Sequence, residues 1–570
     1  MVSCVFILLP AVFAFLYVRA FGVSVVYRDA WSIVPLFDKW SSGTLSVSDL
    51  WRFYNVHRMF FPSSVELLLG NITNYDNIVE MYLILICFLL TLATLFLAFR
   101  NDIKASWLFL FLPVSLLVFS FRQHENMLWG YQICFAFAQT FSVLALFLLY
   151  VLGRKDFIKA PFVAALGSAT IASFSAAQGL FVWPAGLLQL FIGPLERPVK
   201  KPLIVLWGLA GVGEWVAYFI GYTNPPNNPS VLYVLKHPAV AMEYFLNLLG
   251  SSLFWQETFA FVGGLLLSGL AFVSFLLIHR YGRLSQYSFW VSLLLFSFLT
   301  MTFTTVGRAG FGAQQALRSG YSSFSILAVV SVYAMVVKMA LARRSAINTG
   351  LLAALAGVVL LSVALSYPEG IKEGNEEKAL RKKAAFVLST YESQPDEALV
   401  PNLVGDPEQT KLVRRRAPVL QRLGYNVFSE RQARGLLPPP LSDLSPVASP
   451  PLYSVTVAGN AVSQDNQYID VPKEASFIQL VGWAVDADNE STAGGVYIDI
   501  DGKIFPAFYG TDRQDVAEHL GVPSYRYSGF ERALPISEIG AGTHEVSFVV
   551  LTTDKKGYYR SDQKVALKVR

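Results

Sequence analysis

Residues 81–99 read MYLILICFLLTLATLFLAF and contain no charged side chain. An α-helix rises about 1.5 Å per residue, so a run of this length spans the ~30 Å hydrocarbon core of a bilayer. This stretch therefore predicts a transmembrane helix. Including it, eleven runs that are wholly or almost wholly uncharged predict membrane spans, near 2–22, 79–99, 105–121, 132–152, 160–177, 179–195, 203–222, 258–278, 288–306, 321–340 and 347–367.

The composition of the whole chain also indicates a membrane protein. Of its 570 residues, 54% are hydrophobic and only 15% are charged, whereas a soluble protein uses about 25% charged residues. The formal net charge of +5 is too small to suggest a nucleic-acid partner. Cys4, Cys87 and Cys134 all lie within apolar runs, where a cysteine usually acts as a small hydrophobe, so we expect no disulfide framework.

The placement of basic residues predicts the orientation of the spans. If the N-terminus is cytoplasmic, every short cytoplasmic connection is basic, as the positive-inside rule requires. These connections contain Arg100, Lys104, Arg154, Lys155, Lys159, Arg197, Lys200, Lys201, Arg280, Arg283, Lys338, Arg343 and Arg344. The first run lacks the basic start and cleavage site of a signal peptide, so we interpret it as a retained span. Residues 368–570 then lie in the periplasm of a Gram-negative cell, and the protein lies in the inner membrane.

The part of the chain after the last span divides into two regions. Residues 368–451 contain a charged helical stretch, 373–392, and a proline-rich linker. Within 452–570 the pattern changes to alternating apolar and polar residues, which predicts β-strands. Asp501-Gly502 lies between two such runs and predicts a type I′ hairpin. The expected fold is therefore a polytopic α-helical membrane domain, 1–367, followed by a helical segment with its linker and an exoplasmic β-sandwich.

Acidic residues of the long first exoplasmic loop, 23–78, are candidate catalytic bases. Asp29 directly follows the first span, so its carboxylate is placed at the membrane boundary, where it could take a proton from a hydroxyl. A helix cap or a solvated loop carboxylate is the simpler interpretation of the same residue. Asp38 and Glu66 lie in the same loop and are the alternative bases.

Basic or protonatable residues are also present in the exoplasmic loops, against the positive-inside bias. They are His57, Arg58, Arg122, His124, Lys236, His237, Arg308 and Arg318. Arginine forms bidentate, charge-assisted hydrogen bonds to phosphate, and the glycines around Arg308 would let the backbone approach a ligand closely. These residues indicate either a bound anionic phosphate or anchoring to lipid headgroups.

One further carboxylate, Glu214, interrupts the span at 203–222. An intramembrane carboxylate is often functional, but Glu214 could instead be protonated and hydrogen-bonded to a neighbouring helix. The sequence at 486–490 lacks the spacing of an EF-hand loop, and we expect a solvated β-loop there. The chain contains no P-loop, GxSxG, HExxH or CxxC motif.

Together these features resemble the GT-C superfamily of polytopic membrane glycosyltransferases. The shared features are many spans, a cytoplasmic N-terminus and a large first exoplasmic loop with an acidic residue just after the first span. The chain is similar to bacterial members with a D-x-W…P…G-x-L…HR…P first loop, matched by Asp29, Trp31, Pro35, Gly43, Leu45, His57, Arg58 and Pro62. An N-x-L-W-G-x-Q motif is matched by Asn126, Leu128, Trp129, Gly130 and Gln132. The chain departs from the pattern in reading Arg318-Ser319-Gly320-Tyr321 instead of S-R-Y, and in having Val56 where an acidic residue often precedes His-Arg.

The resemblance covers about residues 1–370 and implies a reaction and its site. It implies a polyprenyl-phosphate sugar donor, an acceptor hydroxyl on a surface polysaccharide or glycolipid such as O-antigen, and contact with membrane lipids. The implied roles are Asp29 as base; His57, Arg58, Arg308 and Arg318 for the donor phosphate; and Trp31, Arg122, His124, Glu125, Asn126, Trp129 and Gln132 for the donor or acceptor sugar. No metal ligands are assigned, and Mg²⁺ or Mn²⁺ is optional because arginines can carry the phosphate charge. The tail resembles a β-module attached to various glycosyltransferases, which implies acceptor binding or scaffolding.

Two other classes share much of this pattern. A lipid or sugar transporter, including a flippase, would predict internal repeats and broken helices around a midplane site, and the sequence shows no repeat. A glycan ligase or polymerase would have the same topology but would use a polyprenyl-diphosphate-linked oligosaccharide.

The predicted orientation has a direct test. A reporter that is active only in the periplasm should be active when it is fused after Arg570, because eleven spans place that end outside the inner membrane. Activity of a cytoplasm-only reporter at the same position would contradict the orientation.

Overall fold

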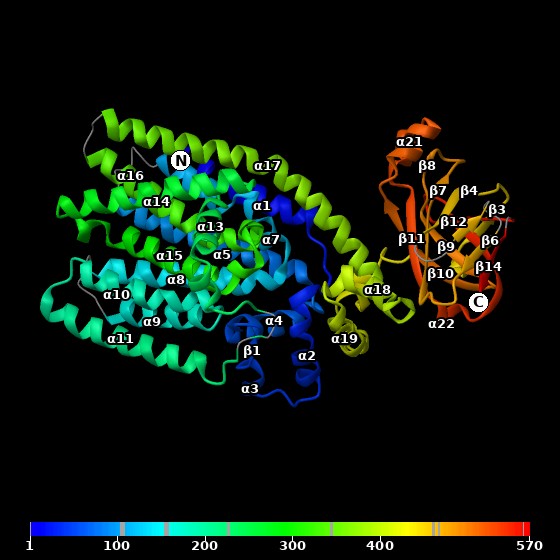
Figure 1. Ribbon diagram of the computed structural model, residues 1–570, viewed down its shortest axis with the longest axis horizontal. Helices are drawn as coiled ribbons and strands as arrows, with labels where there is room; N and C mark the ends of the chain where they lie inside the picture. Colours follow the sequence, from blue (N-terminus) through cyan, green and yellow to red (C-terminus); the bar gives the residue numbers. More distant parts are fainter. Residues whose placement is uncertain are drawn as a thin grey trace. The chain divides into compact units, whose positions relative to one another are not determined.

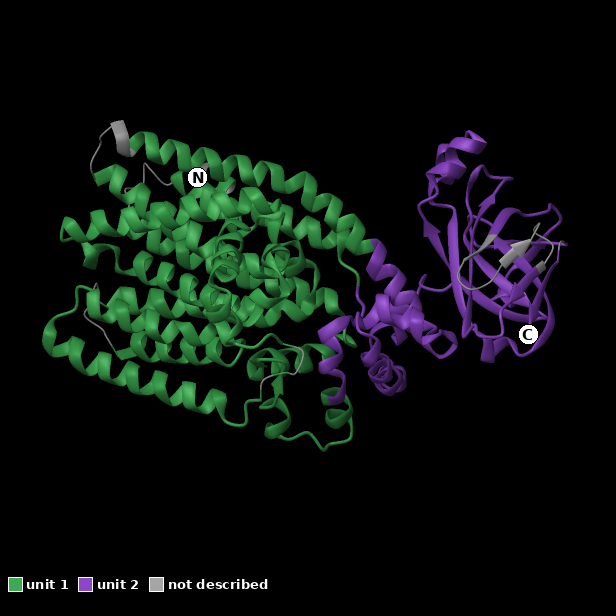
Figure 2. Ribbon diagram, viewed as in Figure 1, with its two compact units in different colours: residues 1–23, 36–378 green, residues 24–35, 379–570 purple. Residues whose placement is uncertain are grey.

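The computed structural model (Figure 1) describes residues 2–102, 109–152, 159–223, 225, 228–342, 346–458, 462–464, 468–562 and 564–570. The chain forms two compact units (Figure 2). Unit 1 contains residues 1–23 and 36–378, and unit 2 contains residues 24–35 and 379–570. Residues 24–35 of the first exoplasmic loop thus belong to the same unit as the tail.

Unit 1 is built from helices. Its longer helices are α1 Val2–Phe21, α4 Phe60–Thr73, α5 Asn77–Asp102, α8 Ile133–Leu152, α9 Lys159–Ser173, α10 Val182–Ile192, α11 Arg197–Phe219, α13 Pro238–Gly250, α14 Glu257–Arg280, α15 Ser288–Arg308, α16 Ser322–Ala342 and α17 Ala346–Ser389. Among the described residues, seven helical segments are long and apolar enough to cross a membrane: Asn77–Asp102, Gly130–Leu152, Arg197–Phe219, Glu257–Arg280, Leu284–Phe311, Ser319–Ala342 and Thr349–Ser389. Phe6–Phe21 and Ala177–Ile192 are shorter apolar helices.

The distribution of apolar side chains explains why these helices suit a bilayer. α16 is almost wholly buried in the centre of unit 1, whereas α11 and α14 expose large apolar residues such as Leu209 and Leu266, which are 67% and 68% exposed. A helix that is apolar on its outer face needs an apolar solvent there. Unit 1 therefore has the architecture of a helical membrane protein.

The predicted spans coincide with helices, with differences at their ends. The runs 160–177 and 179–195 become α9 and α10, which are shorter than expected because a 3₁₀ turn, η5 Ala177–Phe181, separates them. The run 105–121 is only partly described and includes α6 Leu112–Val118. Lys104, Arg154, Lys155, Arg343 and Arg344 lie outside the described residues. The thiols of Cys87 and Cys134 are buried, and the side chain of Cys4 lies outside the described residues.

The tail part of unit 2 begins at Ala379, inside α17, the long green helix that crosses the top of Figure 1. The last predicted span and the charged stretch 373–392 were expected to be separate, but both fall within α17, except for the last three residues of that stretch. Pro368 lies inside this helix and does not end it. Shorter elements follow: η10 Tyr391–Ser393, α18 Asp396–Leu399, η11 Val400–Val404, α19 Thr410–Leu423 and α20 Glu430–Ala433.

The rest of unit 2 is a sheet domain, as predicted. Its strands are β3 Ser445–Val447, β4 Leu452–Ala458, β5 Val462–Gln464, β6 Tyr468–Val471, β7 Phe477–Asp486, β8 Ser491–Thr492, β9 Gly495–Ile500, β10 Lys503–Thr511, β11 Gly529–Pro535, β12 Gly542–Leu551, β13 Gly557–Arg560 and β14 Val565–Val569. Among the described strands the main path runs β4-β7-β11-β10-β9-β12-β14-β6-β5. The path is continuous because β10 pairs with β9 through residues 503–507 and with β11 from Phe508 onward.

The core of the sheet domain is formed by side chains of β7 and β11 together with those of β9, β12 and β14. The ring of Phe530 on β11 packs against that of Phe548 on β12, with centroids 5.8 Å apart. The predicted hairpin joins β9 to β10: Asp501 and Gly502 have φ of 49° and 89°, the positive values that a type I′ turn requires. The Gly502 N–H donates to Oδ1 of Asp499 at 2.8 Å.

Candidate functional site

Arg58 lies in a short hairpin of the first exoplasmic loop, formed by β1 Phe53–Tyr54 and β2 His57–Arg58. Its guanidinium donates to the backbone carbonyls of Trp51, Tyr218 and Ile220, and the ring of Phe53 lies 4.1 Å from its central carbon. Three of the five N–H donors of the guanidinium are therefore used within the protein. The side chain joins the hairpin to the end of α11, and little of its hydrogen-bonding capacity remains for a phosphate.

His57, the neighbouring residue, is held as a neutral imidazole. Its Nδ1 accepts a hydrogen bond from the Ala177 N–H at 3.2 Å, and its ring meets Phe135 edge-on. Burial of the ring, with the positive charge of Arg308 nearby, lowers the pKa of His57 to about 3. At neutral pH, Nε2 therefore carries the proton, and His57 can donate one hydrogen bond to a ligand without adding charge.

Arg308, at the end of α15, donates to a neutral side chain and not to a carboxylate of the described residues. Nη1 donates to Oδ1 of Asn228 at 3.0 Å, and Asn228 in turn donates to Asn55 at the tip of the hairpin. The guanidinium lies 5.7 Å from the ring of Phe311 and forms no ion pair with any described residue. Its half-buried charge can therefore be matched by a bound anion.

Arg318, in contrast, is matched by Glu125 of α7 His124–Leu128. Nη2 of Arg318 lies 2.8 Å from Oε1 of Glu125, and Oε2 accepts from the Gly320 N–H at 3.1 Å. Burial alone would raise the pKa of Glu125, but the charge and hydrogen bonds of Arg318, together with His124 and the Gly320 amide, outweigh it and leave the pKa lowered. Glu125 is thus ionised and fixes the 318–320 loop to α7.

Arg122 and His124 lie against the indole of Trp255. The guanidinium is 4.4 Å from that ring, the imidazole stacks on it at 5.7 Å, and His124 Nε2 lies 3.7 Å from Glu373. Burial lowers the pKa of Arg122 to about 10 and that of His124 to about 4. At pH 7 Arg122 is charged and His124 is neutral. Nε of Arg122 and Nδ1 of His124 have no hydrogen-bond partner among the described residues.

The N-x-L-W-G-x-Q motif is brought next to the first-loop hairpin. Trp129 stacks on Tyr131 with centroids 5.6 Å apart, and Tyr131 meets Tyr54 of the hairpin at 5.9 Å. Asn126 donates to Ser323 Oγ at 2.7 Å. Asn126, Trp129 and Gln132 are buried, so in this arrangement they hold the loops in place and expose no ring or amide to a sugar.

Asp29 lies in unit 2, in the first turn of η1 Arg28–Ser32, and is half-buried. The residue before it, Arg28, has a φ of 47°, a conformation that is uncommon outside glycine and that costs about 1–3 kcal/mol; such strain clusters at functional sites. Trp31 is 1% exposed and its indole is packed in the interior. The ring of Trp31 is therefore not accessible to a sugar in this structure.

Two arginines near Asp29 were not found from the sequence. Arg381 lies over the ring of Tyr27 at 4.0 Å, and Arg416 donates to the carbonyl of Trp31. Both come from the tail, far from the first loop in sequence, so no local pattern connects them. The segment 24–35 is further tied to the tail by Asn426, whose Oδ1 accepts from the Val26 N–H at 3.2 Å.

The two alternative bases lie in different surroundings. Asp38 is half-buried on α2 Val34–Ser41, where its backbone carbonyl accepts hydrogen bonds from the hydroxyls of Ser41 and Ser42. Glu66 is 2% exposed, and burial, with the adjacent Glu80, raises its pKa well above the usual range. The protonated form of Glu66 is therefore favoured and its side chain is shielded from solvent, which makes it a poor base.

Two further features bear on the chemistry. Oε1 of Glu214 on α11 accepts a hydrogen bond from the hydroxyl of Thr170 on α9, an arrangement that fits the structural interpretation of this carboxylate. Within the described ranges, no group of three or more His, Cys, Asp or Glu residues is placed to hold a metal ion.

Comparison with known proteins places the chain in no family. No family model matches it, and no solved structure matches it. The chain is 27% identical over 213 residues to an uncharacterized protein of Archaeoglobus fulgidus. The match covers 34% of this chain and 52% of the archaeal protein, so the chain spans about half the length of that relative.

The different bonding of Arg58 and Arg308 predicts different effects of substitution. Arg58→Lys should lower the free energy of unfolding by at least about 3 kcal/mol, because an unmade bond to a buried group costs about 1–3 kcal/mol and three carbonyls are affected. Arg308→Gln should change it by less than about 1 kcal/mol. Thermal unfolding of the purified protein in detergent measures both. Equal destabilisation by the two substitutions would contradict this assignment of roles.

Proposed function

We propose that this protein transfers a monosaccharide from a polyprenyl-phosphate donor to a hydroxyl of a surface polysaccharide or glycolipid. The observation that carries the proposal is Arg308: a half-buried guanidinium without an ion-pair partner among the described residues, beside neutral His57, at the end of a membrane-type helix. The phosphodiester of such a donor carries one negative charge and would match this guanidinium through charge-assisted hydrogen bonds. A polyprenyl tail would find an apolar environment along the outward faces of α11 and α14.

The bonding of each basic residue suggests how the donor site works. Arg308 supplies charge to the phosphate, and His57 donates a neutral hydrogen bond through Nε2. Arg58 acts through the hairpin that it fixes, and Arg318 acts through the loop that it fixes with Glu125. The sequence predicted that Arg58 and Arg318 bind the donor phosphate. We propose instead that they hold the loops of the donor site in position.

Asp29 is the proposed general base. Glycosyl transfer to a hydroxyl requires loss of its proton as the bond to C1 forms, and a positioned carboxylate contributes about 10²–10⁴-fold to such a step. The strained backbone at Arg28 and the arginines around Tyr27 and Trp31 support a specialised role for this turn. Direct attack of the acceptor oxygen on C1, with departure of the polyprenyl phosphate from the opposite face, inverts the anomeric centre.

We further propose that the protein has four membrane spans in addition to the seven long apolar segments. α1, α9, α10 and the region of α6 supply the four additional spans, which gives eleven spans, a cytoplasmic N-terminus and a periplasmic tail. The sheet domain would then be a periplasmic β-sandwich that serves the acceptor, and the protein would lie in a bacterial inner membrane.

The test of the base is Asp29→Asn, which keeps the size of the side chain and removes its basicity. Turnover of a polyprenyl-phosphate sugar by the purified variant should fall at least ~100-fold, with donor binding unchanged. Asp38→Asn is the matched control in the same loop and should retain near-normal turnover. If Asp29→Asn retains near-normal turnover, Asp29 is not the base.

A further inference from the structure

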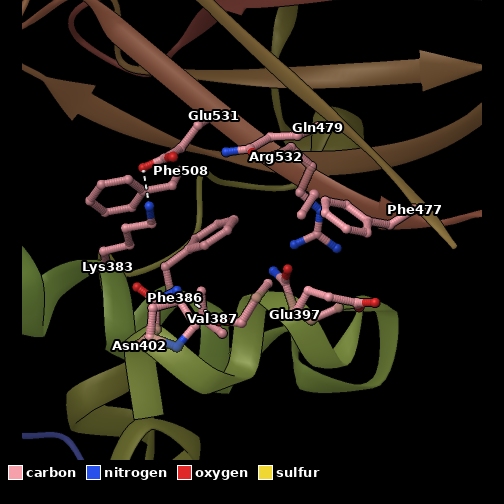
Figure 3. Close-up of a pocket in the computed structure, with 14 residues that line it drawn as sticks. Lys383, Phe386, Val387, Glu397, Asn402, Phe477, Gln479, Phe508, Glu531 and Arg532 are labelled. Carbon is pink, nitrogen blue, oxygen red and sulfur yellow. Dashed lines mark hydrogen bonds and ion pairs between the residues drawn. The ribbon is translucent and has the colours of Figure 1, made fainter. Parts of the chain in front are cut away.

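Unit 2 contains a pocket that the proposed reaction does not use (Figure 3). Its volume is about 130 Å³, roughly ten times the ~10–15 Å³ that one water molecule needs. Side chains from β7, β10 and β11 form one wall, and the end of α17 with α18 and η11 forms the other. The space is large enough for one sugar unit.

Arg532 of β11 is the unusual residue of this pocket. It is 2% exposed, and its guanidinium donates only to neutral groups: Nη1 to the Thr390 hydroxyl at 2.9 Å, and Nη2 to the carbonyl and hydroxyl of Ser393. Its Nε has no hydrogen-bond partner, and the guanidinium forms no ion pair with any described residue. Burial lowers the pKa of Arg532 to about 10, so it is still charged at neutral pH.

None of the nearby carboxylates forms an ion pair with Arg532. Lys383 and Glu531 pair with each other at 2.8 Å. Glu397 is exposed and negatively charged, and its Oε1 accepts from the Ser476 hydroxyl at 2.8 Å. Glu538, whose charge also acts on Arg532, is paired with Lys503 at 2.7 Å. A buried charge is normally paired directly, so the guanidinium of Arg532 points to a ligand with an anionic group.

The rest of the lining suits a sugar ring. Phe386 and Phe508 pack with ring centroids 5.7 Å apart, and Phe477 lies on the opposite side of the pocket (Figure 3). Such rings can stack on the C–H face of a pyranose. Gln479 also lines the pocket, with its amide on the side of Glu531 (Figure 3), and the amide can both donate to and accept from hydroxyl groups.

We propose that this pocket binds an anionic sugar unit of the hexuronic acid type, with the carboxylate on Arg532 and the ring between the phenylalanines. The placement of that unit in the acceptor glycan rests on the proposed function. The preference for an anion rests on Arg532 alone.

Titration calorimetry of the full-length protein in detergent tests the proposal, with D-glucuronate as the ligand and D-glucose and acetate as controls. D-glucuronate should bind at least tenfold more tightly than either control, because only it offers both the carboxylate and the ring. Arg532→Gln should weaken D-glucuronate binding at least tenfold. Arg526→Gln, at an exposed arginine of the same domain that pairs with Asp512, should leave it unchanged.

Equal binding of glucose and glucuronate, or unchanged binding by Arg532→Gln, would overturn the proposal. If Arg532→Gln does not fold, Gln479→Ala replaces it and should weaken glucuronate binding at least threefold; unchanged binding would again overturn the proposal. Asp29→Asn should bind glucuronate as the unmodified protein does. A failure of the proposed catalytic function and a failure of the proposed glucuronate site can therefore be distinguished.

Discussion

The helical unit depends on the satisfaction of buried charge by the protein itself. Away from water, a guanidinium must find acceptors within the fold. Arg58 does so through the carbonyls of Trp51, Tyr218 and Ile220, so the first-loop hairpin is fixed to the end of α11. The position of His57 follows from this attachment, because the two residues form the same short strand.

The partners that the fold supplies also distinguish the other arginines. Arg318 is matched by Glu125, and Arg122 lies against Trp255 under the influence of Glu373 and Glu125. Arg308 has only the neutral Asn228 and the face of Phe311. Of these arginines, it is therefore the one whose charge is most available to an anionic substrate. In unit 2 the corresponding case is Arg532, which is bonded only to hydroxyl and carbonyl groups.

The sequence predicted the parts of the structure that local patterns determine. Charge-free runs located the helices, and alternation with Asp501-Gly502 located the sheet domain and its type I′ hairpin, because these signals depend on near neighbours. The pairing of residues 24–35 with Arg381, Arg416 and Asn426 could not be predicted. It joins segments about 350 to 400 residues apart, and no periodicity carries that information. Charge alone also could not separate Arg58 from Arg308, because their difference is in the hydrogen-bond partners that the fold supplies.

Transfer of a single sugar is the central proposal for this protein. The most direct measurement is mass spectrometry of surface polysaccharide from otherwise identical cells with and without the gene. We expect a repeat unit that is heavier by one monosaccharide residue when the gene is present. Identical repeat-unit masses would contradict glycosyl transfer, and a difference of a whole oligosaccharide chain would indicate a ligase or polymerase.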